Sequence, residues 1–218
     1  NQVSALDILV RPTYHIYKNS TLVPNEKNAN KKVVLITIDD GPTIRSKEVM
    51  RILKKHNAGA IFFINGYHDK DAPNEIKEEY KQGFMVGNHT YSHLNLKKEN
   101  DFSKVKDEIN KNTKLIKAKT GIPPKFFRPP YGEFNKEIKD FIKSEGMTMM
   151  NWSGAAKDWE KNTENEEVFI SNVMNNIHDG EILLIHEHPW TLKYLDKLLT
   201  TIKEKGYTFI DPSQITTD

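Results

Sequence analysis

The sequence predicts an α/β protein, a (β/α) barrel with about seven parallel strands, and two patterns carry this prediction. Short runs of β-branched, aliphatic and aromatic residues recur along the chain, and amphipathic segments lie between them. Parallel strands need long crossover connections, so this alternation indicates βα units whose helices cover the strands. Seven or eight such units indicate a barrel. An open doubly wound sheet is the alternative, because periodicity does not show closure.

Each element follows from a local pattern. The predicted strands are the apolar runs at 33–38, 60–64, 84–89, 125–130, 147–152, 181–186 and 207–210. The clearest predicted helices place apolar residues on one face, at Val49, Ile52 and Leu53, at Val105, Ile109 and Ile116, at Ile138, Phe141 and Ile142, and at Leu192, Leu195, Leu199 and Ile202. Weaker helical patterns span 74–82 and 166–178.

Length and composition restrict the class of protein. Residues 1–31 form a polar lead-in and are expected to be an N-terminal extension or linker, and residues 32–218 are expected to form one domain. Lys and Arg total 32 against 30 Asp and Glu, so charge gives no reason to expect nucleic acid or an anionic membrane as a partner. The apolar runs are far shorter than the ~20 residues of a membrane helix. We therefore expect a soluble chain without a transmembrane segment, and no signal peptide is visible in it.

Residues with reactive side chains follow the ends of several predicted strands. The chain has no cysteine, so a metal would have to be held by histidine and carboxylate. In a βα barrel the working face lies at the carboxyl ends of the strands. The residues found there are Asp39, Asp40, His89, His93, Arg128, Asp158 and His186.

Each of these residues also has an ordinary structural explanation. The sequence IDDGP at 38–42 contains turn-forming residues, and two histidines four apart are more often surface or core residues than metal ligands. Arg128 could be a surface charge, and His186 could be a hydrogen-bonded, half-buried histidine. These separate explanations do not account for all of the residues falling on one predicted rim. Two imidazoles and one carboxylate there would suit a divalent metal.

Five ordered motifs resemble those of the polysaccharide deacetylases, carbohydrate esterase family 4, which share the NodB homology domain. They are TIDDGP at 37–42, HTYSH at 89–93, RPPYG at 128–132, KDW at 157–159 and LLIH at 183–186, and the resemblance covers about residues 32 to 212. The resemblance implies a distorted (β/α) barrel and a catalytic domain over 32–218.

The resemblance also implies a role for individual residues. One divalent metal would be bound by Asp40, His89 and His93. Zinc is the first choice, and cobalt and nickel are the alternatives, since imidazole binds all three. Asp39 would be the general base, held by Arg128, and His186 the general acid, charged through Asp158. Tyr131 would give a backbone N–H to the oxyanion. Trp159 and Leu183 would line the pocket for the acetyl methyl group.

The implied activity is removal of N-acetyl groups from N-acetylglucosamine units, with peptidoglycan the first expected substrate and chitin oligomers the second. O-acetyl xylan esterases share the motifs, so ester hydrolysis stays open, as do a catalytically silent glycan-binding homologue and an iron oxygenase. We expect a monomer that acts outside the membrane after export, secreted or attached to the cell wall. Two departures from the family pattern are Ala155, where an Asp is frequent, and the pair His188 and Trp190 after the last motif.

Overall fold

The computed structural model describes residues 11–217, and its centre is one mostly parallel sheet. The strands run in the order β1-β2-β9-β3-β4-β5-β6-β7, while β10 pairs with β3 and β8 with β9. Their bounds are β1 Tyr14–Tyr17, β2 Thr21–Pro24, β3 Val33–Gly41, β4 Ala60–Ile64, β5 Met85–Asn88, β6 Phe126–Phe127, β7 Thr148–Met149, β8 Gly154–Ala155, β9 Glu181–His186 and β10 Thr208–Phe209. All seven predicted strands are confirmed. No ladder joins β7 to β1 within residues 11–217, so the sheet is a distorted, partial barrel.

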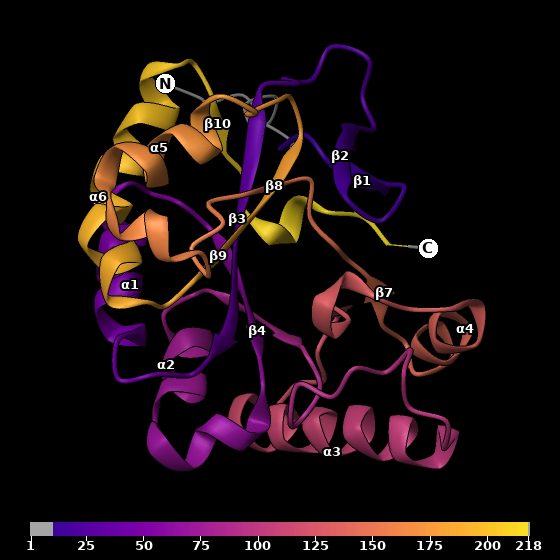
Figure 1. Ribbon diagram of the computed structural model, residues 1–218. Helices are drawn as coiled ribbons and strands as arrows, with labels where there is room; N and C mark the ends of the chain where they lie inside the picture. The colour runs from indigo at the N-terminus through magenta and orange to yellow at the C-terminus, as the bar shows by residue number, and fades with distance from the viewer. Residues whose placement is uncertain (1–10, 218) are drawn as a thin grey trace, which may run out of the picture.

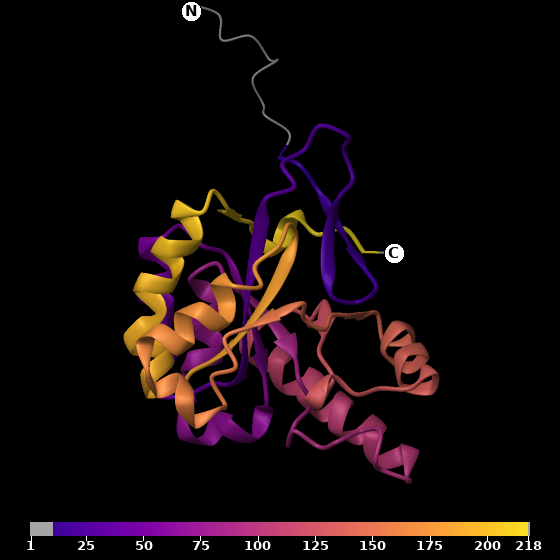
Figure 2. The ribbon, with the colours of Figure 1, turned by 45° about the horizontal axis from the view of Figure 1, so that its top comes forward.

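Within residues 11–217, six α-helices connect and cover the strands. They are α1 Ser46–Lys55, α2 Glu75–Lys81, α3 Phe102–Thr120, α4 Lys136–Ser144, α5 Glu166–Met174 and α6 Pro189–Glu204. Helices α1, α2, α5 and α6 lie together on one side of strands β3, β4 and β9, and α3 and α4 lie toward β7 (Figures 1 and 2). Every predicted helix is found. Within the described chain, none of the helices is both long and apolar enough to span a bilayer.

The central strand β3 shows how the sequence positions the rim. Its side chains alternate between two cores: Val34, Ile36 and Ile38 pack under the helices, whereas Val33 and Leu35 pack inside the barrel. Successive side chains of a strand point to opposite faces, so both faces of β3 are apolar and buried. The interior face continues through Thr37 and Asp39 at the strand's carboxyl end.

An antiparallel hairpin, β1 and β2, extends the sheet beyond β9. The sequence predicted no strand here. The segment is short and polar, but Tyr14 and Leu22 are buried and pack with Ile182 in the interior core. The backbone of Thr216 donates a hydrogen bond to the carbonyl of Tyr14, so the hairpin also contacts the C-terminal segment (Figure 2). Residues 1–10 of the expected N-terminal extension lie outside the described residues.

A carboxylic acid is buried at the other end of the barrel. Glu181, the first residue of β9, is 1% exposed, and neither carboxyl oxygen has a hydrogen-bond partner within residues 11–217. Gly154 makes room for it, because a Cβ there would lie 2.2 Å from Glu181 Oε1. Nε2 of the half-buried His178 is 3.7 Å from the same oxygen. Burial raises the pKa of Glu181 to about 8.

Replacing Glu181 with Gln tests the effect of this acid on stability. Between about pH 4.5 and 8 the folded protein keeps a proton on Glu181 that the unfolded chain has released, so the free energy of unfolding falls as pH rises through that window. The slope is up to roughly 1.4 kcal/mol per pH unit. Urea unfolding at pH 5 and pH 8 should therefore show a smaller loss of stability in Glu181→Gln than in the parent. The same pH dependence in parent and Glu181→Gln would contradict the raised pKa of Glu181. His178→Gln is the control for a contribution from the neighbouring imidazole.

Candidate active site

Two adjacent carboxylates at the end of β3 enter the same pocket. In a regular strand Asp39 and Asp40 would point in opposite directions. The register of β3 against β4 shifts between Asp39 and Gly41, and Asp40 has a left-handed backbone with φ +68°. A left-handed non-glycine residue costs roughly 1 to 2 kcal/mol. The bulge places both carboxylates on the pocket, which the alternation of a regular strand did not predict.

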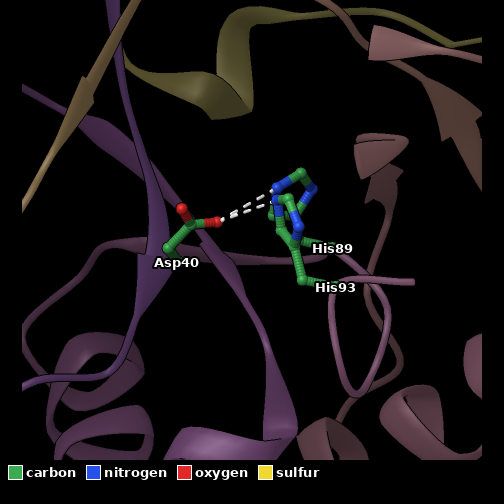
Figure 3. Close-up of side chains that lie close together, drawn as sticks. All are labelled: Asp40, His89 and His93. Carbon is green, nitrogen blue, oxygen red and sulfur yellow. Dashed lines mark ion pairs between the residues drawn. The ribbon is translucent and has the colours of Figure 1, made fainter. Parts of the chain in front are cut away.

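Asp40 faces two histidines that come from the segment after β5. Its Oδ1 is 3.3 Å from His89 Nε2 and 3.4 Å from His93 Nε2. Figure 3 marks these two ion pairs as dashed lines. This oxygen is buried and accepts no well-formed hydrogen bond within residues 11–217. The three side chains form a group that could hold a metal ion, and two imidazoles with one carboxylate are a frequent ligand set for zinc. The residues thus fit the divalent metal that the motifs imply.

A backbone hydrogen bond orients the ring of His89. Its Nδ1 lies 2.6 Å from the carbonyl oxygen of Arg128 and donates to it, so Nε2 is left unprotonated toward Asp40 in the neutral ring. The ring of His93 packs edge-on against the rings of His89 and Tyr131, with a distance of 4.8 Å between ring centroids in each pair. Burial raises the pKa of Asp40, but the facing histidines more than offset this and hold its pKa below the ordinary value.

The other carboxylate, Asp39, is paired with a fully buried arginine. Nη1 of Arg128 donates to Asp39 Oδ1 at 2.8 Å and to the hydroxyl of Thr37 at 2.7 Å. Nε and Nη2 donate to the carbonyl oxygens of Met150 and Asn151. Arg128 is therefore not the surface charge that was the alternative explanation. It fixes the direction of the Asp39 carboxylate.

A second acid and histidine pair lies across the pocket. His186 Nδ1 is 2.7 Å from Oδ1 of Asp158, and Oδ2 of Asp158 accepts from the backbone N–H of His186 and from the hydroxyl of Thr191. His186 Nε2 is 3.5 Å from Oδ2 of Asp40. Burial lowers the pKa of His186, but the hydrogen bond and charge of Asp158 outweigh it and raise the pKa to about 9. His186 is thus protonated at neutral pH.

The reactive side chains line an open pocket of about 430 Å³. Its lining residues are Asp39, Asp40, His89, His93, Tyr131, Trp152, Trp159, Leu184 and His186. Tyr131 has a left-handed backbone with φ +62° and a 62% exposed side chain. Trp159 is 52% exposed and meets His186 edge-on at 5.8 Å. The predicted site residues therefore come together, with one exception.

The exception is Leu183, and the prediction that it lines the pocket is wrong. Leu183 is fully buried in the core beneath the helices, and its neighbour Leu184 lines the pocket instead. On β9 the residues Ile182, Leu184 and His186 share the interior face. The motif LLIH identified the correct strand. Because side chains alternate between the two faces of a strand, Leu184 and not Leu183 faces the pocket.

Sequence reasoning also missed one wall of the pocket and left one residue open. Trp152 lines the pocket, and its position at the end of the predicted strand 147–152 was the signal that could have identified it. The indole N–H of Trp190 donates to the carbonyl oxygen of Asp158 at 3.0 Å. Trp190 therefore packs behind the Asp158 segment, and it is absent from the pocket lining.

A buried glutamate braces the loop that carries the two aspartates. Oε2 of Glu187, the residue after His186, accepts from the hydroxyl of Ser46 at 3.1 Å. The side chain of Arg45 also donates to the backbone carbonyl of Glu187. A Cβ on Gly41 would lie 2.5 Å from Glu187 Oε2, so only glycine fits at this position without a shift. Burial raises the pKa of Glu187 to about 7.

The fold and the site define the class of protein: a partial (β/α) barrel with a candidate metal centre of two histidines and an aspartate, facing a charged acid and histidine pair. Residues 26–150 match the family described as polysaccharide deacetylase. The chain belongs to that family. The sequence-based assignment of the family is confirmed.

Individual relatives agree with this assignment. The chain is 33% identical over 187 residues to a peptidoglycan-N-acetylglucosamine deacetylase of Bacillus cereus, covering 83% of this chain and 67% of that protein. It is also 33% identical over 213 residues to the Listeria monocytogenes peptidoglycan-N-acetylglucosamine deacetylase PgdA, covering 96% of this chain and 44% of that protein. The chain thus spans about two thirds or less of the length of these relatives.

The fold of this chain closely resembles those of solved structures. The crystal structure of the Bc1960 peptidoglycan N-acetylglucosamine deacetylase superimposes with a TM-score of 0.80 at 32% identity, covering 87% of this chain and 90% of that one. The structure of BA3943 of Bacillus anthracis, described as a pseudoenzyme of the same family, gives a TM-score of 0.78 at 30% identity, covering 87% and 68%. Members of one fold in this family thus differ in activity.

Gly41→Ala tests the bracing contact. The added methyl group must displace the buried carboxyl of Glu187, at a cost of roughly 1 to 3 kcal/mol in the free energy of unfolding, and should weaken zinc binding because the loop carrying Asp40 shifts. Removing the obstacle in Gly41→Ala/Glu187→Ala should recover part of the loss, which a double-mutant cycle of unfolding free energies measures. Strictly additive effects would contradict the contact.

Asp158→Asn tests the origin of the high pKa of His186. Without the carboxylate the imidazolium loses its partner, so the pKa should fall from about 9 toward or below the ordinary value. NMR titration of the His186 ring in metal-free protein measures this change. Thr191→Val, which removes one hydrogen bond to Asp158 but keeps its charge, is the control and should shift the titration much less. Equal titration of parent and Asp158→Asn would contradict the assignment.

Proposed function

We propose that this chain is a metal-dependent deacetylase that removes N-acetyl groups from N-acetylglucosamine units of a glycan and releases acetate. The observation that carries the proposal is the arrangement of two charged pairs across one pocket. Asp39 with Arg128 lies on one side and His186 with Asp158 on the other. The names of the relatives support the reaction, and the site supplies the groups that amide hydrolysis needs.

The base side of the reaction is assigned to Asp39. Its carboxylate accepts a hydrogen bond from Arg128, which aims it into the pocket. Asp39 accepts the proton of the attacking water. A divalent ion held by Asp40, His89 and His93, zinc by preference, would supply Lewis-acid polarisation of the acetyl carbonyl. The backbone N–H of Tyr131 donates to the oxyanion as negative charge develops there.

The acid side of the reaction is assigned to His186. A poor leaving amine must receive a proton as the C–N bond breaks, and a charged imidazolium can deliver it from Nε2. Asp158 keeps that imidazole charged and oriented through Nδ1. Trp152, Trp159 and Leu184 provide apolar walls suited to an acetyl methyl group and a sugar face. Base and acid thus work from opposite sides of the scissile bond.

The substrate we propose first is peptidoglycan, with chitin oligomers second. The peptidoglycan-specific names of the relatives favour this order. Such glycans lie outside the membrane, so we propose that the chain acts there after export, as a monomer and in contact with the cell wall. We also propose a catalytic domain over 32–218 preceded by an extension over 1–31, whose hairpin β1–β2 joins the sheet of that domain at β9.

Two rival functions use the same fold. An O-acetyl esterase would need the same base and metal group but a better leaving group. A catalytically silent glycan-binding protein is favoured only by Ala155, which faces Leu184 across the β8 and β9 ladder where relatives of the family frequently carry an Asp. The charged pairs around Asp39 and His186 have no use in a protein that only binds.

Acetate release decides among these functions. The parent chain should release acetate from peptidoglycan or chitin oligomers faster than from acetylated xylan, and a chelator should abolish the release until zinc is restored. Preference for acetylated xylan would favour the esterase. No release from any of the three substrates with zinc, cobalt or nickel added would overturn the enzymatic proposal.

Two variants separate the assigned roles. His89→Ala should lose zinc and turnover together, because a ligand is missing. Asp39→Asn should keep zinc but lower turnover by about 10²-fold or more, because the base is missing. Metal content by elemental analysis and acetate release are measured on the same samples. Normal turnover in Asp39→Asn would show that another group is the base.

A further inference from the structure

A second group of metal-ligating side chains lies next to the first. One ligand atom from each of Asp158, His186 and His188 lies within 4.8 Å of the other two, as is also the case for Asp40, His89 and His93. The arrangement again combines two imidazoles and one carboxylate, the ligand set that suits zinc. The proposed reaction uses Asp158 and His186 but has no use for His188.

The position of His188 is well defined. Its ring stacks on the indole of Trp190 at 4.5 Å with an interplanar angle of 8°, and it lies 5.8 Å from the ring of His186. Trp190 is in turn fixed by its hydrogen bond to the carbonyl of Asp158. Within residues 11–217 no side-chain hydrogen bond involves the ring nitrogens of His188. A half-buried imidazole is thus held beside an acid and a second imidazole while its nitrogens stay available.

We infer that Asp158, His186 and His188 form a second, inhibitory site for a divalent metal ion such as zinc. Binding forms coordinate bonds from a carboxylate oxygen of Asp158 and one ring nitrogen of each histidine to the ion. The proton on His186 Nδ1, now bonded to Asp158, leaves to solvent. No electron is transferred, and no other reactant is needed.

The geometry requires only a small rearrangement. Metal bonds to oxygen and nitrogen of about 2.0 to 2.2 Å at a tetrahedral angle separate two ligand atoms by about 3.3 Å. His186 Nδ1 and Asp158 Oδ1 are now 2.7 Å apart, so a modest rotation of either side chain admits an ion. Because the ion must replace a short hydrogen bond and a proton, this site should bind zinc more weakly than the group around Asp40, by roughly tenfold or more.

The inhibitory effect rests on the proposed function. A metal ion that replaces the proton and the hydrogen bond to Asp158 leaves His186 unable to act as the general acid. Zinc should therefore activate at low concentration, through the group around Asp40, and inhibit at higher concentration. The activity would then be low both when zinc is scarce and when it is in excess.

Metal stoichiometry tests the site without reference to activity. Equilibrium dialysis of the full metal-free chain against excess Zn²⁺, followed by elemental analysis, should give two ions for the parent and one each for His89→Ala and His188→Phe. The double variant should bind none. His188→Phe keeps an aromatic ring on Trp190, and His188→Gln provides a second substitution should the first disturb folding. His15→Phe, which removes an exposed histidine from the hairpin, is the matched control and should still bind two.

Activity then tests the inhibitory role. With rising zinc the parent should show activation followed by inhibition, whereas His188→Phe should show activation alone, with the same maximal rate. One bound ion in the parent, or equal stoichiometry in His89→Ala with and without His188→Phe, would overturn the second site. Two ions with no inhibition of an active parent would overturn the inhibitory role. An inactive chain that still binds two ions would refute the proposed function but not the second site.

Discussion

The buried pair of Arg128 and Asp39 is the interaction on which the rest of the site depends. Both side chains are almost completely removed from solvent, at 0% and 3% exposure. Burying two charges costs several kcal/mol per ion unless their partners compensate, so such a pair is weak evidence for stability. Its value here is geometric. The guanidinium donates to Asp39, to the hydroxyl of Thr37 and to two backbone carbonyls, and thereby ties the end of β3 to the segment after β7.

The same arginine links the proposed base, Asp39, to the candidate metal group. Its side chain holds Asp39, while its backbone carbonyl accepts the hydrogen bond from His89 Nδ1. One residue therefore sets the direction of the Asp39 carboxylate and the tautomer of His89, a proposed metal ligand. The face of the guanidinium lies 4.3 Å from the ring of Phe63, which excludes water from this contact. A change at Arg128 would disturb both halves of the site, so its effects on metal binding and on turnover would not be separable.

Much of the fold and most of the site could be predicted from the sequence, for identifiable physical reasons. Hydrophobic periodicity predicted seven of the parallel strands and the six helices described for residues 11–217, but not the two-residue strand β8 beside β9. The rule that reactive residues follow strand ends brought Asp39, His89 and His186 to one rim. The hairpin β1 and β2 was not predicted, because four-residue strands with exposed faces lack a periodic signal and are stabilised only by tertiary contacts. Leu183 was wrongly predicted to line the pocket, because a sequence motif does not show which face of the strand each of its residues occupies.

What the sequence could not give is the bulge at the end of β3. Regular alternation would send Asp39 and Asp40 to opposite faces, and only the left-handed backbone of Asp40 turns both into one pocket. Two carboxylates so close raise the electrostatic energy of the loop, and the buried glutamate Glu187 lies behind it. The loop is therefore stabilised by its cationic and imidazole neighbours: Arg128 on one acid, the histidines on the other. Strain in the backbone and repulsion between the acids both follow from placing the proposed base, Asp39, beside the proposed metal-binding carboxylate, Asp40. The bulge is therefore the feature that adapts this sheet to its proposed chemistry.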